Sequence, residues 1–155
     1  MKIYDMKEKL SNGLTGIAGE YFVAAELSLR GFMASVTLRN NDSIDIHASK
    51  LSDKGKMFAI QVKTSQINNR KWILNKKAEL SSSDSHFYIF VSLKGERERP
   101  EYFIIPSKTL AKIVKDSHKR WLITPGKNGQ THNDSDMRKF EDVKGEYLER
   151  WDLLN

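Results

Sequence analysis

The sequence predicts a mixed α/β domain in which a central β-sheet is flanked by helices. Helical and strand-like hydrophobic patterns alternate along the chain, the strand-like runs are short, and no shift in composition separates two halves. The length of 155 residues also fits one domain, since domains most often have about 100–150 residues. We therefore expect a single domain that spans residues 1–155.

The first element expected is a helix over residues 14–30. Apolar residues recur there at three- and four-residue steps: Leu14, Ile17, Ala18, Tyr21, Ala24 and Ala25. Ser11 or Asn12 can cap the start of this helix, and Gly31 is placed to end it. Two small residues are expected to let the helix pack closely on the sheet: Gly16 and Gly19.

Three strands follow, over residues 32–38, 44–48 and 58–63. The last two alternate apolar and polar residues around a turn at 52–55, which predicts a hairpin. Its apolar face carries Ile44, Ile46, Phe58, Ile60 and Val62. Its polar face carries Asp45, His47, Gln61 and Lys63.

The second half of the chain continues the α/β pattern. Further strands are expected at residues 71–74, 87–93 and 102–105, and residues 125–136 have the composition of an exposed loop. Three helices are also expected, over residues 75–80 with Asn75 as cap, from Ser107 as cap to about Lys115, and at the end of the chain. The last rests on the spacing of Phe140, Val143, Tyr147, Trp151 and Leu154.

Composition excludes several functional classes. The chain has no cysteine, which excludes disulfides, a thiolate nucleophile, a zinc ribbon and an iron–sulfur cluster. No apolar run approaches the roughly 18 residues that a membrane helix needs. The N-terminal residues lack the apolar core of a signal peptide, so we expect a cytoplasmic protein.

The positive charge is concentrated in one segment. The chain has 26 basic and 20 acidic residues, for a net charge of +6. Residues 50–77 carry eight of the basic side chains and one acid, so the rest of the chain is close to neutral. A solvated basic face is the simplest interpretation, but such a segment also attracts polyanions.

The polar face of the predicted hairpin can form a cation site. A turn near residues 53–54 pairs positions whose numbers sum to about 106–108, which places Asp45 beside Gln61 and Lys63. Asp45, Gln61 and the carbonyl of Val62 offer the oxygen ligands that Mg²⁺ prefers, and Lys63 can stabilise charge on a phosphoryl group. Glu20 lies at the flank of the first helix and could add a second carboxylate.

Three segments resemble the PD-(D/E)XK nuclease superfamily: Gly16-Ile17-Ala18-Gly19-Glu20, Ser43-Ile44-Asp45-Ile46 and Ile60-Gln61-Val62-Lys63-Thr64-Ser65. The resemblance covers residues 13–65. Within the superfamily, these segments are similar to those of small Holliday-junction resolvases and methyl-directed restriction nucleases. It implies a restriction-endonuclease-like core and a metal-dependent DNA endonuclease. It also implies Mg²⁺ or Mn²⁺ as cofactor.

The resemblance implies a role for each matching residue. Glu20 matches the helix acid, Asp45 the metal-binding aspartate and Lys63 the catalytic lysine. The candidate catalytic residues are these three together with Gln61. Gln61 stands where the superfamily usually has an acid, and it counts with Glu20 and Asp45 as a candidate metal ligand. Gln61 removes one formal negative charge from the site, and Ile44 replaces the usual proline.

The expected partner is duplex or branched DNA. A basic segment that directly follows the proposed catalytic strand is predicted to bind it through Arg70, Lys71, Trp72, Lys76 and Lys77. Trp72 could stack on a base, although tryptophans are more commonly buried in the core. Cutting a duplex or resolving a junction favours a homodimer, since two scissile bonds must be reached.

Two alternatives remain open from the sequence. The chain could be a nuclease-like module that binds nucleic acid without cutting it, because Gln61 weakens the metal site. It could also be an unrelated basic α/β domain that binds a protein partner. Metal dependence separates the first alternative from an enzyme, and DNA binding separates the second from both.

Overall fold

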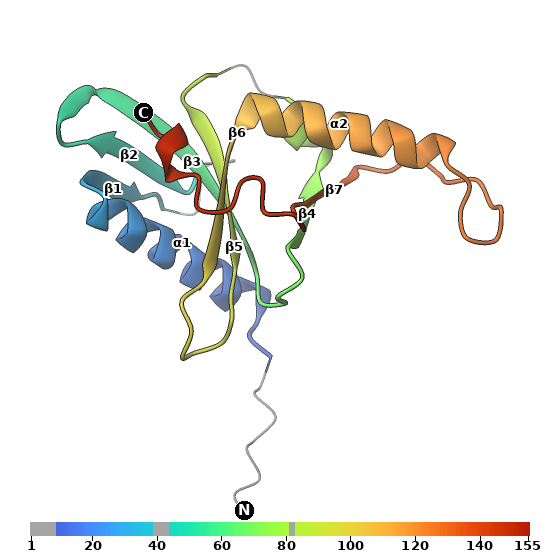
Figure 1. Cartoon of the computed structure of the whole chain (residues 1–155), viewed down its shortest axis with the longest axis horizontal. Helices are drawn as coiled ribbons and strands as arrows, with labels where there is room; N and C mark the ends of the chain where they lie inside the picture. The colour runs from blue at the N-terminus through green and yellow to red at the C-terminus, as the bar shows by residue number, and fades with distance from the viewer. Residues whose placement is uncertain (1–8, 39–43, 81–82) are drawn as a thin grey trace, which may run out of the picture.

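The structure is a computed structural model that describes residues 9–38, 44–80 and 83–155. Ser43 of the second motif lies outside these ranges. A five-stranded sheet has the order β1-β2-β3-β5-β6, and a separate two-stranded sheet pairs β4 with β7 (Figure 1). The elements are α1 (Asn12–Leu29), β1 (Phe32–Val36), β2 (Ile46–Lys50), β3 (Asp53–Ser65), β4 (Lys71–Asn75), η1 (Lys76–Glu79), β5 (His86–Ser92), β6 (Glu101–Pro106), α2 (Ser107–Ile123), β7 (Met137–Glu141) and η2 (Trp151–Leu153).

The main sheet is mixed, as the sequence predicts. Its central pair, β3 and β5, runs parallel, while β1–β2, β2–β3 and β5–β6 are antiparallel. None of the helices in the described part of the chain is long and apolar enough to cross a bilayer.

Alternate residues of the strands build two separate cores, one on each face of the sheet. On one face, Ile60 and Ile89 pack with Val23 and Leu27 of α1. The other face carries Tyr88, Phe90 and Phe103, which pack under α2 and the β4–β7 sheet with the apolar residues Trp72, Leu74, Leu110, Val114 and Phe140. The two helices therefore cover opposite faces.

The ends of α1 follow the sequence prediction, but its buried face does not. Ser11 caps the helix by accepting a hydrogen bond from the amide of Leu14, and Gly31 follows with φ of 81°. Half of the predicted apolar stripe is exposed, namely Leu14, Tyr21 and Ala25, with Tyr21 65% exposed, while the other half is only partly buried. The face that packs on the sheet consists instead of Thr15, Gly19, Val23, Glu26 and Leu27.

Glu26 is buried in this interface because two guanidinium groups pair with its carboxylate. Arg99 Nε donates to Glu26 Oε1 at 2.8 Å, and Arg30 pairs with the other oxygen. Burial raises the pKa of Glu26, but the hydrogen bonds from Arg99 and Arg30 outweigh it and lower the pKa overall. A hydrophobic pattern cannot reveal a buried acid whose partners include a residue far along the chain.

The prediction of a C-terminal helix is wrong. Phe140 lies in β7, and the chain then crosses the β6 edge of the main sheet, where Ile104 donates to the carbonyl of Tyr147 at 3.0 Å. Trp151 and Leu154 continue onto the core beneath α1. The segment thus contacts both cores in turn, and its apolar spacing reflects that path rather than a helical period.

The other helix predictions are confirmed in part. Asn75 caps η1 by accepting from the amide of Lys77. The helix after β6 runs to Ile123, well beyond the predicted end, and its N-cap is Pro106 rather than Ser107.

Candidate active site

The candidate site lies where β2 and β3 separate. The two strands pair from Ile46 opposite Ile60, in the predicted register, whereas β3 runs on to Ser65 alongside β5 alone. Asp45 stands at this fork, immediately before β2. Beyond Ile60, therefore, β3 has no ladder partner on the β2 side among the described residues.

Asp45 is fixed in place by three hydrogen bonds. Its amide donates to the carbonyl of Ile60 at 2.9 Å, and its own carbonyl accepts from the amide of Thr37 at 2.9 Å. Its side-chain Oδ2 accepts from the amide of Val62 at 2.7 Å. The carboxylate is therefore oriented by the backbone of β3, and Oδ2 is already engaged.

A cleft of about 430 Å³ opens beside Asp45. It is lined by Asn12, Gly13, Gly16, Glu20, Thr37, Asp45, Val62, Lys63 and Thr64. The structure thus brings Glu20 of α1, Asp45 just before β2 and Lys63 of β3 to one cleft. A carboxylate pair beside an ammonium group can bind a cation and stabilise negative charge on a substrate.

Gln61 does not line the cleft, but it directly precedes Val62 in β3. Its side-chain Oε1 is buried and has no hydrogen-bond partner among the residues that the structure describes. An unpaired buried carbonyl oxygen is costly unless something accepts its lone pairs. A bound cation is one kind of partner that would satisfy such an oxygen.

Tyr88 is a neighbour of the site that sequence reasoning missed. It pairs with Gln61 across β3 and β5. Burial raises the pKa of Tyr88, and the nearby Asp45 carboxylate raises it further. The parallel pairing that brings Tyr88 here joins strands far apart in the sequence, so no local pattern indicates it. His47 is exposed and is not part of the cleft wall.

Close contact between α1 and β3 brings Glu20 to the strands. A Cβ atom added to Gly19 would overlap the side chain of Thr64, lying 2.8 Å from its Cβ. The expected role of Gly19 in close packing is therefore confirmed. The same expectation for Gly16 is wrong, because a Cβ there would meet nothing within 4 Å.

The residues present fit a hard divalent cation with few protein ligands. No group of three or more His, Asp or Glu side chains suited to a metal occurs in residues 9–38, 44–80 and 83–155. Mg²⁺ often binds through one or two carboxylates and keeps several waters. Glu20, Asp45 and the buried oxygen of Gln61 match that kind of donor set.

The basic segment after β3 is only partly available to a ligand. Trp72 is 4% exposed, and its Nε1 donates to the carbonyl of Val91 at 3.2 Å. The prediction that this indole stacks on a base is therefore wrong. Arg70 pairs with Glu101 at 2.9 Å. The remaining three residues are exposed lysines: Lys71, Lys76 and Lys77.

The fold is similar to that of a bacterial homing endonuclease, I-Ssp6803I. The TM-score is 0.53 at 15% sequence identity, and the match covers 94% of this chain and 92% of the other. No protein family and no curated protein matches the chain. The comparison therefore shows a nuclease-like fold, and it extends over nearly the whole chain.

Proposed function

We propose that this protein is a metal-dependent DNA endonuclease of the PD-(D/E)XK type. The observation that carries the proposal is the convergence of Glu20, Asp45 and Lys63 on one cleft. The likeness in fold to a homing endonuclease supports DNA as the substrate. The class of reaction is hydrolysis of a phosphodiester bond.

Each residue has a distinct task in this proposal. Asp45 and Gln61 would hold Mg²⁺ or Mn²⁺, with Glu20 completing the site. The ion, when bound, supplies a water of lowered pKa and positive charge near the phosphate. Lys63 would orient that water or stabilise the charge that develops on the phosphoryl oxygens. Val62 holds Asp45 in position through its amide.

A cleavage assay tests the proposal. Purified protein is incubated with supercoiled plasmid and with a synthetic four-way junction, in Mn²⁺ or in EDTA. The variants are Asp45→Asn, which keeps an acceptor for the Val62 amide, and Lys63→Ala. Lys144→Ala serves as the control, because Lys144 is exposed and does not line the cleft.

We expect cutting in Mn²⁺ that EDTA abolishes. Loss of a group that transfers a proton or stabilises charge in the transition state lowers rates by about 10²–10⁴-fold. The cleavage rates of both site variants should therefore fall by at least about 10²-fold. Lys144→Ala should cut like the wild type. Cleavage that survives both site variants would refute the assigned site.

A second candidate function follows from Gln61. With one formal charge fewer, the site could bind a metal too weakly for catalysis, and the protein would then be a nucleic-acid-binding module. Such a module would bind DNA equally well in EDTA and would not cut either substrate. Gln61→Glu would then be the next variant, since it restores the missing charge. Absence of both binding and cutting would favour the protein-binding domain.

We further propose that two copies associate through the outer face of α1. The exposed residues of this helix include Leu14, Tyr21, Phe22 and Leu29, which are 41–79% exposed. None of the exposed residues of α1 is charged, although 30% of the whole chain is. Because α1 also lines the cleft, a symmetric pair could present two sites to one DNA.

Sedimentation equilibrium tests this association. We expect a dimer for the wild type and a monomer for Tyr21→Lys, since the variant would place an unpaired charge on the apolar face that the dimer buries. The control is Lys56→Glu, which changes the charge at an exposed position on β3, away from α1. A monomeric wild type at high concentration would refute the proposal.

A further inference from the structure

We propose that the outer face of α2 is a second DNA-binding surface, which contacts the phosphate backbone away from the cleft. This inference rests on the proposed function for the identity of its partner. The surface consists of Lys108, Lys112, Lys115 and Lys119, and it is called the lysine face below. Their steps of four, three and four residues place all four side chains on one side of the helix.

The lysine face points away from the protein core. The opposite side of α2 carries Ser107, Leu110, Ala111 and Val114, which are buried, whereas all four lysines are exposed. From Lys108 to Lys119 the helix rises roughly 16 Å, at about 1.5 Å per residue. That length corresponds to about five base-pair steps of duplex DNA.

The lysine face has little neutralising charge. Lys108 pairs with Asp84 at 2.6 Å, while the other three make no ion pair with any residue in the described ranges. Asp116 is the one acid in the helix sequence. Isolated lysines of this kind are commonly no more than a solvated surface, but a row of them also releases counterions from a polyanion on binding.

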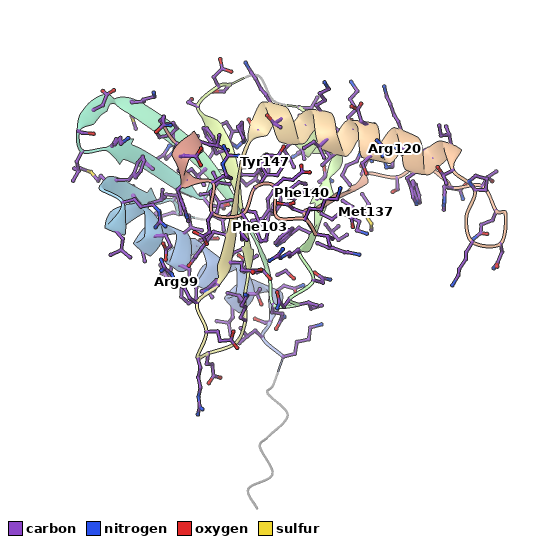
Figure 2. The ribbon with its side chains drawn as sticks, viewed as in Figure 1. Arg99, Phe103, Arg120, Met137, Phe140 and Tyr147 are labelled. Carbon is purple, nitrogen blue, oxygen red and sulfur yellow. The ribbon has the colours of Figure 1, made fainter. Side chains whose placement is uncertain are left out.

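Further cations lie on η1 and on α2 itself. η1 packs against α2 and carries Lys76 and Lys77, both exposed. Neither of them makes an ion pair with a described residue. Arg120 adds a further charge near the outer end of α2, where Figure 2 shows it. Lys76 and Lys77, which belong to the basic segment predicted from the sequence, therefore add positive charge on an element that contacts α2.

The far end of α2 is anchored rather than loose. The helix extends beyond both sheets and is followed by a long loop (Figure 1). Trp121 stacks on His118 and on His132, with ring centroids 5.5 and 4.1 Å away. His118 Nε2 is 2.7 Å from Asp134 Oδ1, which ties the loop back to the helix. A held arm loses less conformational freedom when it binds a duplex.

The test is the salt dependence of DNA affinity. The double variant Lys115→Gln/Lys119→Gln is compared with Lys56→Gln/Lys144→Gln, which removes the same charge from exposed positions outside α2. Binding of a labelled duplex is measured by fluorescence anisotropy in EDTA, between about 50 and 200 mM salt. Thermal melting checks that both variants are folded.

We expect the lysine-face variant to reduce the slope of log K against log salt by about 1.8, or 0.9 for each phosphate that is no longer neutralised. The control should change the slope by a small fraction of that. Cleavage of saturating plasmid should be unchanged, because neither lysine lines the cleft.

The outcomes separate this inference from the proposed function. A wild-type slope in the lysine-face variant, with normal cutting, overturns the inference alone. A reduced slope in a protein that never cuts supports the inference and overturns the endonuclease. A wild-type protein that does not bind the duplex at all overturns both.

Discussion

Replacing Gly19 and Gly16 by alanine should have opposite effects on stability. Both glycines lie inside α1, where alanine is a better helix former by about 0.5–1 kcal/mol. At Gly16 the new methyl group meets nothing within 4 Å, so this gain should appear undiminished. At Gly19 it overlaps the side chain of Thr64, so helix and strand must move apart.

The size of the difference follows from the contact at Gly19. Overpacking a tightly packed contact costs about 1–3 kcal/mol. Because the helix-propensity gain is common to both variants, the two should differ in free energy of unfolding by that same about 1–3 kcal/mol. In a domain of 150–250 residues each kcal/mol corresponds to about 2–4 °C in Tm.

Urea unfolding and thermal melting of the two variants measure the difference. Thr64→Ala removes the Oγ1 and Cγ2 atoms that the methyl group meets, so it should partly restore Gly19→Ala, while the 2.8 Å approach to Cβ remains. The coupling in this double-mutant cycle should be about 0.5–3 kcal/mol. Equal stability of Gly16→Ala and Gly19→Ala would refute the close approach of α1 to β3.

Three further predictions concern the interior and its ion pairs. The hydrogen bond from Arg70 lowers the pKa of Glu101 below 4.5. The pair therefore stabilises the fold above that pH, and this contribution is lost on acidification. In urea unfolding, Glu101→Gln should flatten the decline of the midpoint at acid pH. The hydroxyl of Tyr102 is buried without a partner among the described residues, so Tyr102→Phe should be neutral or stabilising by about 1 kcal/mol in urea unfolding, and a large loss would contradict this. Trp72→Phe loses the hydrogen bond to the Val91 carbonyl and leaves a cavity, so it should lower the free energy of unfolding by about 2–4 kcal/mol. DNA affinity in anisotropy titrations should stay unchanged.

The hairpin half of the site could be predicted because its geometry is local. A tight turn and a period of two determine which residues share a face. The turn lies at residues 51–52, slightly before the predicted 52–55, because Asp53 already pairs with Lys50. Asp45, Gln61 and Lys63 therefore had to lie near each other in any register that kept Ile46 and Ile60 on one side. The observed pairing of these two isoleucines agrees with that reasoning.

The packing of α1 could not be predicted in the same way. Counting apolar residues favours the face with Tyr21, yet that face is exposed and the helix docks through Gly19 and the ion-paired Glu26. Close approach of backbones depends on the absence of a side chain, and burial of an acid depends on arginines from other segments. Neither property contributes to a hydrophobic period.

The site therefore combines two parts whose stability has different origins. Asp45 and Lys63 are placed by neighbouring strands and by the hydrogen bond to Val62, whereas Glu20 is placed by the docking of α1 through Gly19 against Thr64. Loosening that contact should move Glu20 while leaving the hairpin intact. If Glu20 completes the metal site, Gly19→Ala should weaken metal-dependent cutting more than it weakens DNA binding, because the basic surfaces lie on other elements. A matched loss of both would mean that α1 also shapes the DNA-binding surface.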